Sequence, residues 1–261
     1  APEEEGPGQE AEPYPLQPPN YPVTIGDGDN NEPTVAISPT DPNTMVAGSN
    51  DYNTPDGDSW CGFYTTHDGG KTWTEDLLPG YPGDSRSSEL SGFMGAGDPV
   101  IVADPEGNFH YAGIAFKRSR NPLNPLGFGL NLGMDNCIFY AKSTNNGDSF
   151  DHVVVVWSAL HSLVRFNDKE WIAVDPQNPQ NIYIAWVIFT GLVTARLMVS
   201  SSTDGGDSWS LPVTVSESTS GEFNIQGAAI VVDDNSNVHL TWMGFGDGQV
   251  RYSKSTNNGA S

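Results

Sequence analysis

The stretch STDGGDSW at residues 202–209 recurs, with small changes, at three other places in the chain. The other copies read THDGGKTW at 66–73, STNNGDSF at 143–150 and STNNGAS at 255–261. All four follow the pattern Ser/Thr-x-Asp/Asn-x-Gly-x-Ser/Thr, and an aromatic residue closes the first three. Because recurring units of this kind indicate a repeat architecture, these stretches decide the fold.

A pair of candidate strands lies upstream of each copy. The pairs read PTVAISPTDPNTMVAG (33–48), PVIVADPEGNFHYAG (99–113), WIAVDPQNPQNIYIAW (171–186) and AAIVVDDNSNVHLTW (228–242). The Asp-Pro, Asn and Gly residues inside them are typical of turns that reverse the chain. A third alternating strand precedes each copy directly. We therefore predict an all-β fold, a β-propeller of four-stranded blades with the repeated turn between the third and fourth strands.

The repeats also predict how the chain is divided. An acidic, Pro-rich N-terminal extension covers 1–22, and about four blades cover 23–261. The last copy stops at Ser261, before its expected aromatic residue, so we expect the fourth blade to be incomplete at the C-terminus. Closed propellers have about 4–8 blades, and open sheet edges invite pairing. We expect self-association or further blades, with the N-terminal extension held against a partner surface.

The composition limits the function classes. The chain has 261 residues, with 33 acidic and 11 basic side chains and a net charge of −22, which repels nucleic acid and anionic lipid. The 29 glycines and 20 prolines predict many turns and disfavour helical bundles. The apolar run at 182–199 divides at Thr190-Gly191 into two strands, so we predict no membrane span. The N-terminus is typical of a chain left after signal cleavage and suggests export.

The repeated turn resembles that of the bacterial neuraminidase repeat, or Asp-box, family, whose members form sialidase-like β-propellers. The resemblance covers about residues 31–261. The family includes sialidases, other glycosidases and non-catalytic binding modules, so the repeat does not decide activity. The Asp or Asn of each turn is expected to cap backbone amides and to have a structural role, and these residues are Asp68, Asn145, Asp204 and Asn257.

The resemblance implies where a sialidase site would lie. Family sialidases hold the substrate carboxylate with the Arg of an Arg-Ile-Pro motif, but Asn31 stands at the matching position. Asn cannot replace the bidentate guanidinium pair, so we expect no sialoside cleavage. Asp51 falls near the family's acid/base Asp. Under a hydrolase interpretation, Asp51 would pair with Asp98 or Asp168 as the catalytic carboxylates.

Three further groups of residues are candidates for binding. Asp27, Asp29 and Asn31 alternate as calcium ligands do, although a solvated acidic turn explains them equally simply. Trp186 and Trp242 either stack on a sugar ring or fill the core between sheets. The only basic cluster either grips an acidic ligand or offsets the negative field, and it consists of Lys117, Arg118 and Arg120.

The two cysteines, Cys61 and Cys137, lie shortly before a Phe-Tyr pair in equivalent predicted strands of neighbouring blades. An exported protein meets oxidising conditions, so we predict a disulfide between them. No cofactor other than calcium is indicated. We predict a secreted or cell-surface, non-catalytic propeller module that binds extracellular carbohydrate or protein, or that forms a structural unit of an extracellular assembly. The alternative is a glycoside hydrolase of the sialidase-like superfamily, of the exo-sialidase type.

Overall fold

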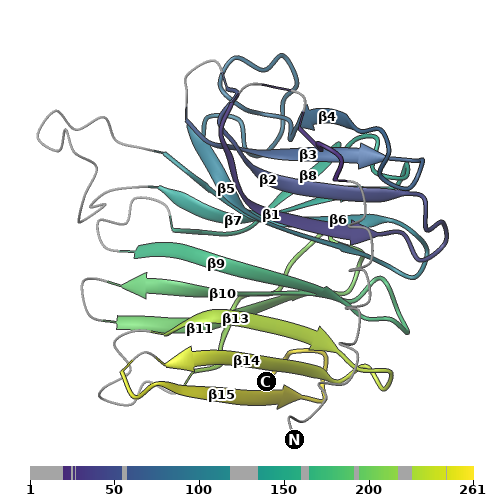
Figure 1. Ribbon diagram of the computed structural model, residues 1–261. Helices are drawn as coiled ribbons and strands as arrows, with labels where there is room; N and C mark the ends of the chain where they lie inside the picture. Colours follow the sequence, from purple (N-terminus) through teal and green to yellow (C-terminus); the bar gives the residue numbers. More distant parts are fainter. Residues whose placement is uncertain are drawn as a thin grey trace, which may run out of the picture.

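The computed structural model describes residues 20–24, 26, 28–54, 58–117, 135–159, 165–190, 194–216, 225–244 and 246–261. The regular elements among them are strands, grouped in four antiparallel sheets that we call blades 1 to 4 (Figure 1). The acidic extension at 1–19 lies outside the described residues. No described segment forms a helix long and apolar enough to cross a membrane.

Each blade is a simple meander in which consecutive strands pair. Blade 1 contains β1 (Asn30–Ile37), β2 (Met45–Asp51), β3 (Trp60–Thr66) and β4 (Thr74–Leu77). Blade 2 contains β5 (Gly95–Ala103), β6 (Phe109–Phe116), β7 (Asn136–Ser143) and β8 (His152–Ala159). Blade 3 contains β9 (Arg165–Val174), β10 (Ile182–Thr190), β11 (Thr194–Ser202) and β12 (Val213–Thr214). Blade 4 contains β13 (Ile225–Val232), β14 (Val238–Gly244) and β15 (Gln249–Ser255). The predicted all-β class and the four-stranded sheets are confirmed for the first three blades.

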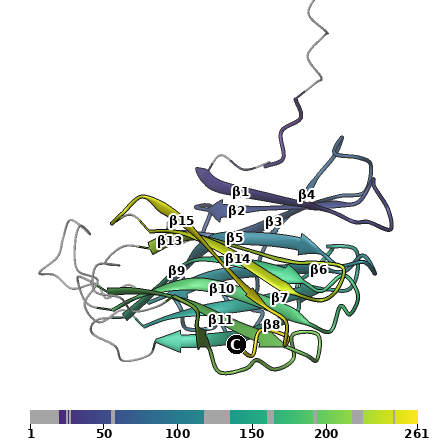
Figure 2. The ribbon, with the colours of Figure 1, turned by 90° about the horizontal axis from the view of Figure 1, so that it is seen from below.

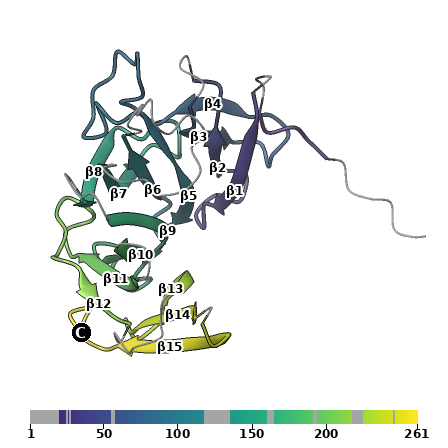
Figure 3. The same cartoon turned by 90° about the vertical axis from the view of Figure 1, so that its left-hand side faces the viewer.

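The blades follow one another along an arc, with blade 1 at one end and blade 4 at the other (Figure 3), and Figure 2 shows the same sheets from below. The first strand of each blade packs beside the first strand of the next, so β1, β5, β9 and β13 form the inner side of the arc. Three apolar clusters fill the spaces between successive blades. Burial of these apolar faces is the main stabilising contribution to such a stack.

All four inner strands carry a bulge at the same relative position. The pairing register with the second strand shifts there, and one residue of each bulge has positive φ. These residues are Glu32 (53°), Asp98 (58°), Lys169 (49°) and Gly227 (69°). A bulge re-aims the side chain it carries, and only glycine adopts this backbone region without strain. Three polar side chains are therefore held in costly conformations on the inner side of the arc.

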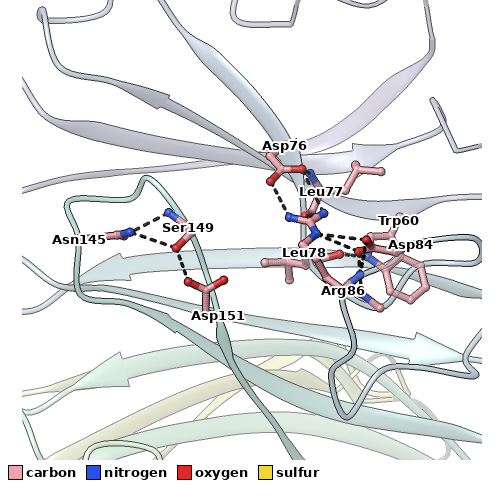
Figure 4. Close-up of polar contacts among 10 residues, drawn as sticks. Trp60, Asp76, Leu77, Leu78, Asp84, Arg86, Asn145, Ser149 and Asp151 are labelled. Carbon is pink, nitrogen blue, oxygen red and sulfur yellow. Dashed lines mark hydrogen bonds and ion pairs between the residues drawn. The ribbon is translucent and has the colours of Figure 1, made fainter.

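The repeated turns directly follow β3, β7, β11 and β15, and in the first three blades a fourth strand comes after the turn. In the turn of blade 3, Asp204 Oδ1 accepts the Ser202 hydroxyl at 2.7 Å and the Ser208 backbone N–H at 2.9 Å. The other three turns have the same two bonds, made by Asp68, Asn145 and Asn257. Figure 4 shows the turn of blade 2, where Asn145 also donates to Ser149.

In blades 2, 3 and 4 a glycine lets the turn approach the preceding blade. Gly206 has φ +99°, and a Cβ added there would collide with the Tyr140 ring of blade 2. Gly147 has φ +87°, and its Cβ would collide with Val46 of blade 1. Any larger residue would separate two blades as well as strain the turn. The turns therefore help to join one blade to the next.

An arginine fixes the segment between blades 1 and 2 (Figure 4). Arg86 donates to both carboxylate oxygens of Asp76 and to those of Asp84, and it also donates to the Leu77 carbonyl. The planar guanidinium suits such forked pairing. The nearby Trp60 indole is fully buried and donates to the Leu78 carbonyl at 2.8 Å.

The predicted disulfide is wrong. Cys61 and Cys137 are both buried free thiols, in β3 and β7 of neighbouring blades. Both belong to the apolar cluster between blades 1 and 2, where they pack as small apolar side chains. Burial raises the pKa of Cys137 to about 12 and that of Cys61 well above its ordinary value.

Candidate functional site

The four bulges meet around one cavity of about 750 Å³, which we call the central cavity. Each inner strand contributes to its wall: residues 32–33 of β1, 98–100 of β5, 169–171 of β9 and 226–229 of β13. The apolar part of the wall comes from Pro33, Pro99, Val100, Ala228 and Ala229. A concave, mostly apolar site with a few converging polar groups is typical of a ligand pocket.

Three charged side chains from three different blades meet in this wall. Lys169 Nζ lies 2.7 Å from Glu32 Oε2 and 3.4 Å from Asp98 Oδ1. Burial, together with a hydrogen bond to Glu32, raises the pKa of Asp98 to about 7. The hydrogen bond from Asp98 lowers the pKa of Glu32, and the Lys169 ammonium acts in the same direction. Of the two coupled carboxyl groups, Asp98 is therefore the one that takes up a proton near neutral pH, while Glu32 stays ionised.

Glu170 is a buried acid without a partner. Its side chain is 3% exposed, and neither carboxyl oxygen has a hydrogen-bond partner in another described residue. Burial and the nearby negative charge of Asp98 raise the pKa of Glu170 well above its usual value. Because an ionised carboxylate without partners is very costly in such surroundings, burial favours the neutral acid at Glu170. It lines the central cavity as an unused proton donor.

Trp171 follows directly and gives the cavity an aromatic surface. Its side chain is 44% exposed, in contrast to the indoles of the core. An exposed indole in a cavity wall can stack on a sugar ring or another flat apolar face.

Neighbouring polar side chains hold the bulges in place. Asn50 accepts the Asp98 backbone N–H at 2.7 Å and donates to Asn31 at 2.8 Å, so it links blades 1 and 2. Gln226 donates to Asp168 Oδ2 at 2.9 Å and links blades 3 and 4. These bonds fix the positions of the charged residues between them.

The three carboxylates proposed from the sequence lie at different places relative to the central cavity. Asp98 lies in the wall of the central cavity. Asp168 is not among the residues lining the cavity, but it accepts a hydrogen bond from Gln226, which is. Asp51 is buried at the end of β2, where it accepts the Tyr64 hydroxyl at 2.9 Å and the Asn53 backbone N–H at 2.8 Å, and it is not among the residues lining the cavity.

Of the two roles that the sequence left open for Trp186 and Trp242, the structure has the second, in which they fill the core between sheets. Trp186 is fully buried and donates to Asn167 at 2.9 Å. Trp242 is 7% exposed and packs in the cluster between blades 3 and 4. Their strands are covered on that face by a neighbouring blade, so neither ring reaches a ligand.

The basic and calcium candidates fall partly outside the described residues. Lys117 lies 4.0 Å from Asp135 and above the Phe93 ring, while Arg118 and Arg120 are not described. Asp27 is likewise not described. The Asn31 side chain accepts a bond from Asn50, and the Asp29 carbonyl accepts one from the Tyr52 backbone. In the part of the chain that the structure describes, no three His, Cys, Asp or Glu side chains gather to hold a metal, so calcium remains a prediction.

Sequence reasoning missed Glu32, Lys169, Glu170 and Trp171. A signal for them was present, because Glu32-Pro, Asp98-Pro and Lys169-Glu stand at matching positions just before the repeated strand pairs. Polar residues at one matching position of several blades converge on the centre of a propeller. Extending the repeats upstream, by one residue in the first two blades and by two in the third, brings Glu32, Asp98 and Lys169 into register.

Neither protein-family models nor curated protein sequences give a match to this chain. Solved structures do resemble it. One is a protein of unknown function from Dyadobacter fermentans, with TM-score 0.56 and 18% identity, covering 89% of this chain and 67% of that chain. Another is an α-L-arabinanase from Penicillium chrysogenum complexed with arabinobiose, with TM-score 0.58, 13% identity and coverages of 88% and 64%.

A third similar structure is the NanB sialidase of Streptococcus pneumoniae, with TM-score 0.58, 11% identity and coverages of 95% and 54%. This chain therefore spans about two thirds or less of the length of these structures. At such low identity the likeness concerns the fold. The likeness to these structures supports a β-propeller fold for this chain.

Proposed function

We propose that the protein is an extracellular propeller that binds the end of a neutral glycan in its central cavity. The observation that carries this proposal is the composition of the wall, in which exposed Trp171 stands beside the unpartnered acid Glu170. The indole would stack on a sugar ring, and the acid would donate a hydrogen bond to a hydroxyl or ring oxygen. Location outside the cell and the Asp-box assignment belong to the same proposal.

The charge of the cavity supports a neutral ligand over sialic acid. Lys169 is the one basic residue among those lining it, and it already contacts Glu32 and Asp98. A sugar carboxylate would therefore meet two acidic groups and no free guanidinium. A sugar whose recognition depends on hydroxyl groups meets no such penalty.

Calorimetric titration with arabinobiose and sialyllactose tests this function. We expect arabinobiose, or another neutral oligosaccharide from a panel, to bind, and sialyllactose to give no heat. Trp171→Ala should weaken binding at least about tenfold, which corresponds to 1.4 kcal/mol. Tyr21→Ala is the matched control, because Tyr21 is 50% exposed and is not among the residues lining the cavity. Sialyllactose binding, or equal affinities for wild type and Trp171→Ala, would contradict the proposal.

Glycoside hydrolysis is a second candidate, which the protonation of the site favours. Neutral Glu170 could give its proton to the glycosidic oxygen as the C–O bond breaks. The Glu32–Asp98 pair would supply the second carboxylate, either to activate a water molecule or to attack the anomeric carbon. Lys169 would keep this pair partly ionised.

Release of nitrophenol from neutral nitrophenyl glycosides tests hydrolysis. Glu170→Gln preserves the size of the side chain and removes the proton donor, so turnover should fall about 10²–10⁴-fold. Glu106→Gln, on an exposed turn, should have no effect. If neutral glycans bind and no glycoside is cleaved, the protein is a binding module, as the sequence analysis favours.

A further inference from the structure

We propose that two buried asparagines, Asn136 of blade 2 and Asn167 of blade 3, are positioning residues that hold Lys169 and Trp171 in the wall of the central cavity. Neither asparagine is among the described residues that line the cavity. Both act through β9, which contains the bulge at Lys169 and then Trp171. The effect on glycan binding rests on the proposed function, whereas the effect on the charged groups does not.

The side chain of Asn136 holds β9 from the neighbouring blade. Its Oδ1 accepts the backbone N–H of Asn167 at 2.9 Å and the side-chain Nδ2 of Asn167 at 2.7 Å. Its Nδ2 donates to the Arg165 carbonyl at 3.0 Å. One amide of blade 2 therefore binds the start of β9 through its donor and its acceptor, directly ahead of the bulge.

Asn167 continues this network into its own blade. Its Oδ1 accepts the Trp186 indole N–H at 2.9 Å. Both asparagines and Trp186 are fully buried. The loss of any of these bonds would leave a buried polar group unsatisfied, so the paired network favours one arrangement. The bonds therefore fix the start of β9 between blade 2 and the core of blade 3.

The bulge of β9 needs such support from its surroundings. The register with β10 shifts between Ala185 and Val187, and Lys169 has φ +49°. A non-glycine residue in this backbone region is strained and persists only where the surrounding structure fixes it. The bonds at Asn167 fix the strand before Lys169, and the regular pairing of Trp171 with Ala185 fixes it afterwards.

The position of Lys169 determines how strongly its ammonium acts on Asp98. Nζ lies 3.4 Å from Asp98 Oδ1 and 2.7 Å from Glu32 Oε2. Burial and Glu32 raise the pKa of Asp98, the Lys169 charge lowers it, and this charge interaction weakens with distance. A displacement of β9 that lengthens the contact would therefore raise the pKa of Asp98 further. Two more acidic groups interact electrostatically with Asp98, namely Asp168 and Glu170.

Asn181 provides a matched control at the opposite end of blade 3. It directly precedes β10, where Ile182 pairs with Val174 at the far end of β9. Asn181 is 8% exposed, and its side chain donates to Asp175 at 3.2 Å. Asn181→Ala therefore removes a buried amide from the same blade, away from the end of β9 that carries the bulge.

Carbon-13 NMR of the Asp98 carboxyl during a pH titration tests the inference, with Asp98→Asn to assign the resonance. Asn136→Ala and Asn167→Ala should raise the pKa of Asp98 above its wild-type value of about 7, and Asn181→Ala should leave it unchanged. Urea unfolding verifies that each variant is folded. If Asn136→Ala does not fold, Asn136→Ser, which keeps a hydroxyl in the same place, replaces it.

Calorimetry with a neutral oligosaccharide that the wild type binds gives the second readout. Asn136→Ala should bind it at least about tenfold more weakly, because Trp171 moves with β9, and Asn181→Ala should bind it as the wild type does. An Asp98 pKa that is the same in wild type and Asn136→Ala, or that changes equally in Asn181→Ala, would overturn the inference. An unchanged affinity would overturn it for Trp171. If the pKa changes as expected and the wild type binds no glycan, the proposed function fails and the inference stands for Lys169.

Discussion

Lys169 Nζ of blade 3 lies 2.7 Å from Glu32 Oε2 of blade 1, so one ion pair spans the inner side of the arc. The same nitrogen lies 3.4 Å from Asp98 of blade 2. Burial opposes the charge of Lys169, but the bond to Glu32 and the charge of Asp98 raise its pKa overall. Three blades are therefore held together at the cavity by one ammonium group.

Replacing Lys169 with Met should destabilise the protein modestly. Lys169→Met leaves two coupled carboxyl groups without their counter-ion, although the side chain is 44% exposed and solvent screens the loss. We expect the free energy of unfolding in urea to fall by about 1 kcal/mol. Lys71→Met, in an exposed turn, is the control and should change it little. Equal effects in the two variants would show that the ion pair contributes nothing to stability.

The raised pKa of Asp98 predicts how stability depends on pH. The folded state binds this proton with a pKa of about 7, against an ordinary value of 3.8. Between these values the folded state holds more protons than the unfolded state, so the contribution of Asp98 to stability is fully present below about pH 4 and is lost as pH rises through about 7. The slope from this group is at most about 1.4 kcal/mol per pH unit. Glu32 acts oppositely, because its pKa is lowered, but only below its ordinary value of 4.5.

Urea unfolding at pH 5, 6, 7 and 8 measures this slope. Asp98→Asn should flatten it, and Glu170→Gln should flatten it further, because burial raises the pKa of that group as well. Glu106→Gln, on an exposed turn, should leave it unchanged. If Asp98→Asn has the same slope as the wild type, Asp98 is ionised in the folded state throughout this range.

The fold was predictable because its signals are local and repeated. Each turn needs an acceptor such as Asp204, a glycine such as Gly206 and a preceding hydroxyl, and these requirements leave a pattern in the sequence. The alternating strands upstream add a second pattern in phase with the first. Neither pattern depends on how the blades are arranged around the centre.

The site was only partly predictable because it depends on contacts between blades. Glu32, Asp98 and Lys169 are far apart in sequence and meet through equivalent bulges, which no single segment reveals. The sequence left Trp186 between sugar stacking and the core because its sequence context does not show that blade 2 covers it. The prediction for Cys61 failed for a similar reason, since burial rather than pairing accounts for its position.

The buried cysteines give a direct test of the packing between blades 1 and 2. Cys61 and Cys137 are both fully buried, and their raised pKa values disfavour the reactive thiolate. We expect a disulfide-exchange reagent to label no thiol in the native protein at pH 8 and both thiols in denaturant without reductant. Rapid native labelling would show that the blades separate readily, and absence of labelling in denaturant would show a disulfide.

The turn of blade 3 predicts a difference between two substitutions at one position. Asp204 accepts the Ser202 hydroxyl and the Ser208 backbone N–H through Oδ1, so Asp204→Ala leaves both donors unpaired and should destabilise the protein by about 1–2 kcal/mol. Asp204→Asn keeps that oxygen, and Asn145 and Asn257 make the same bonds in their own turns, so it should cost much less. Thermal and urea unfolding of both variants measure the difference. If Asp204→Asn is as destabilising as Asp204→Ala, the negative charge rather than the shared acceptor geometry stabilises the turn.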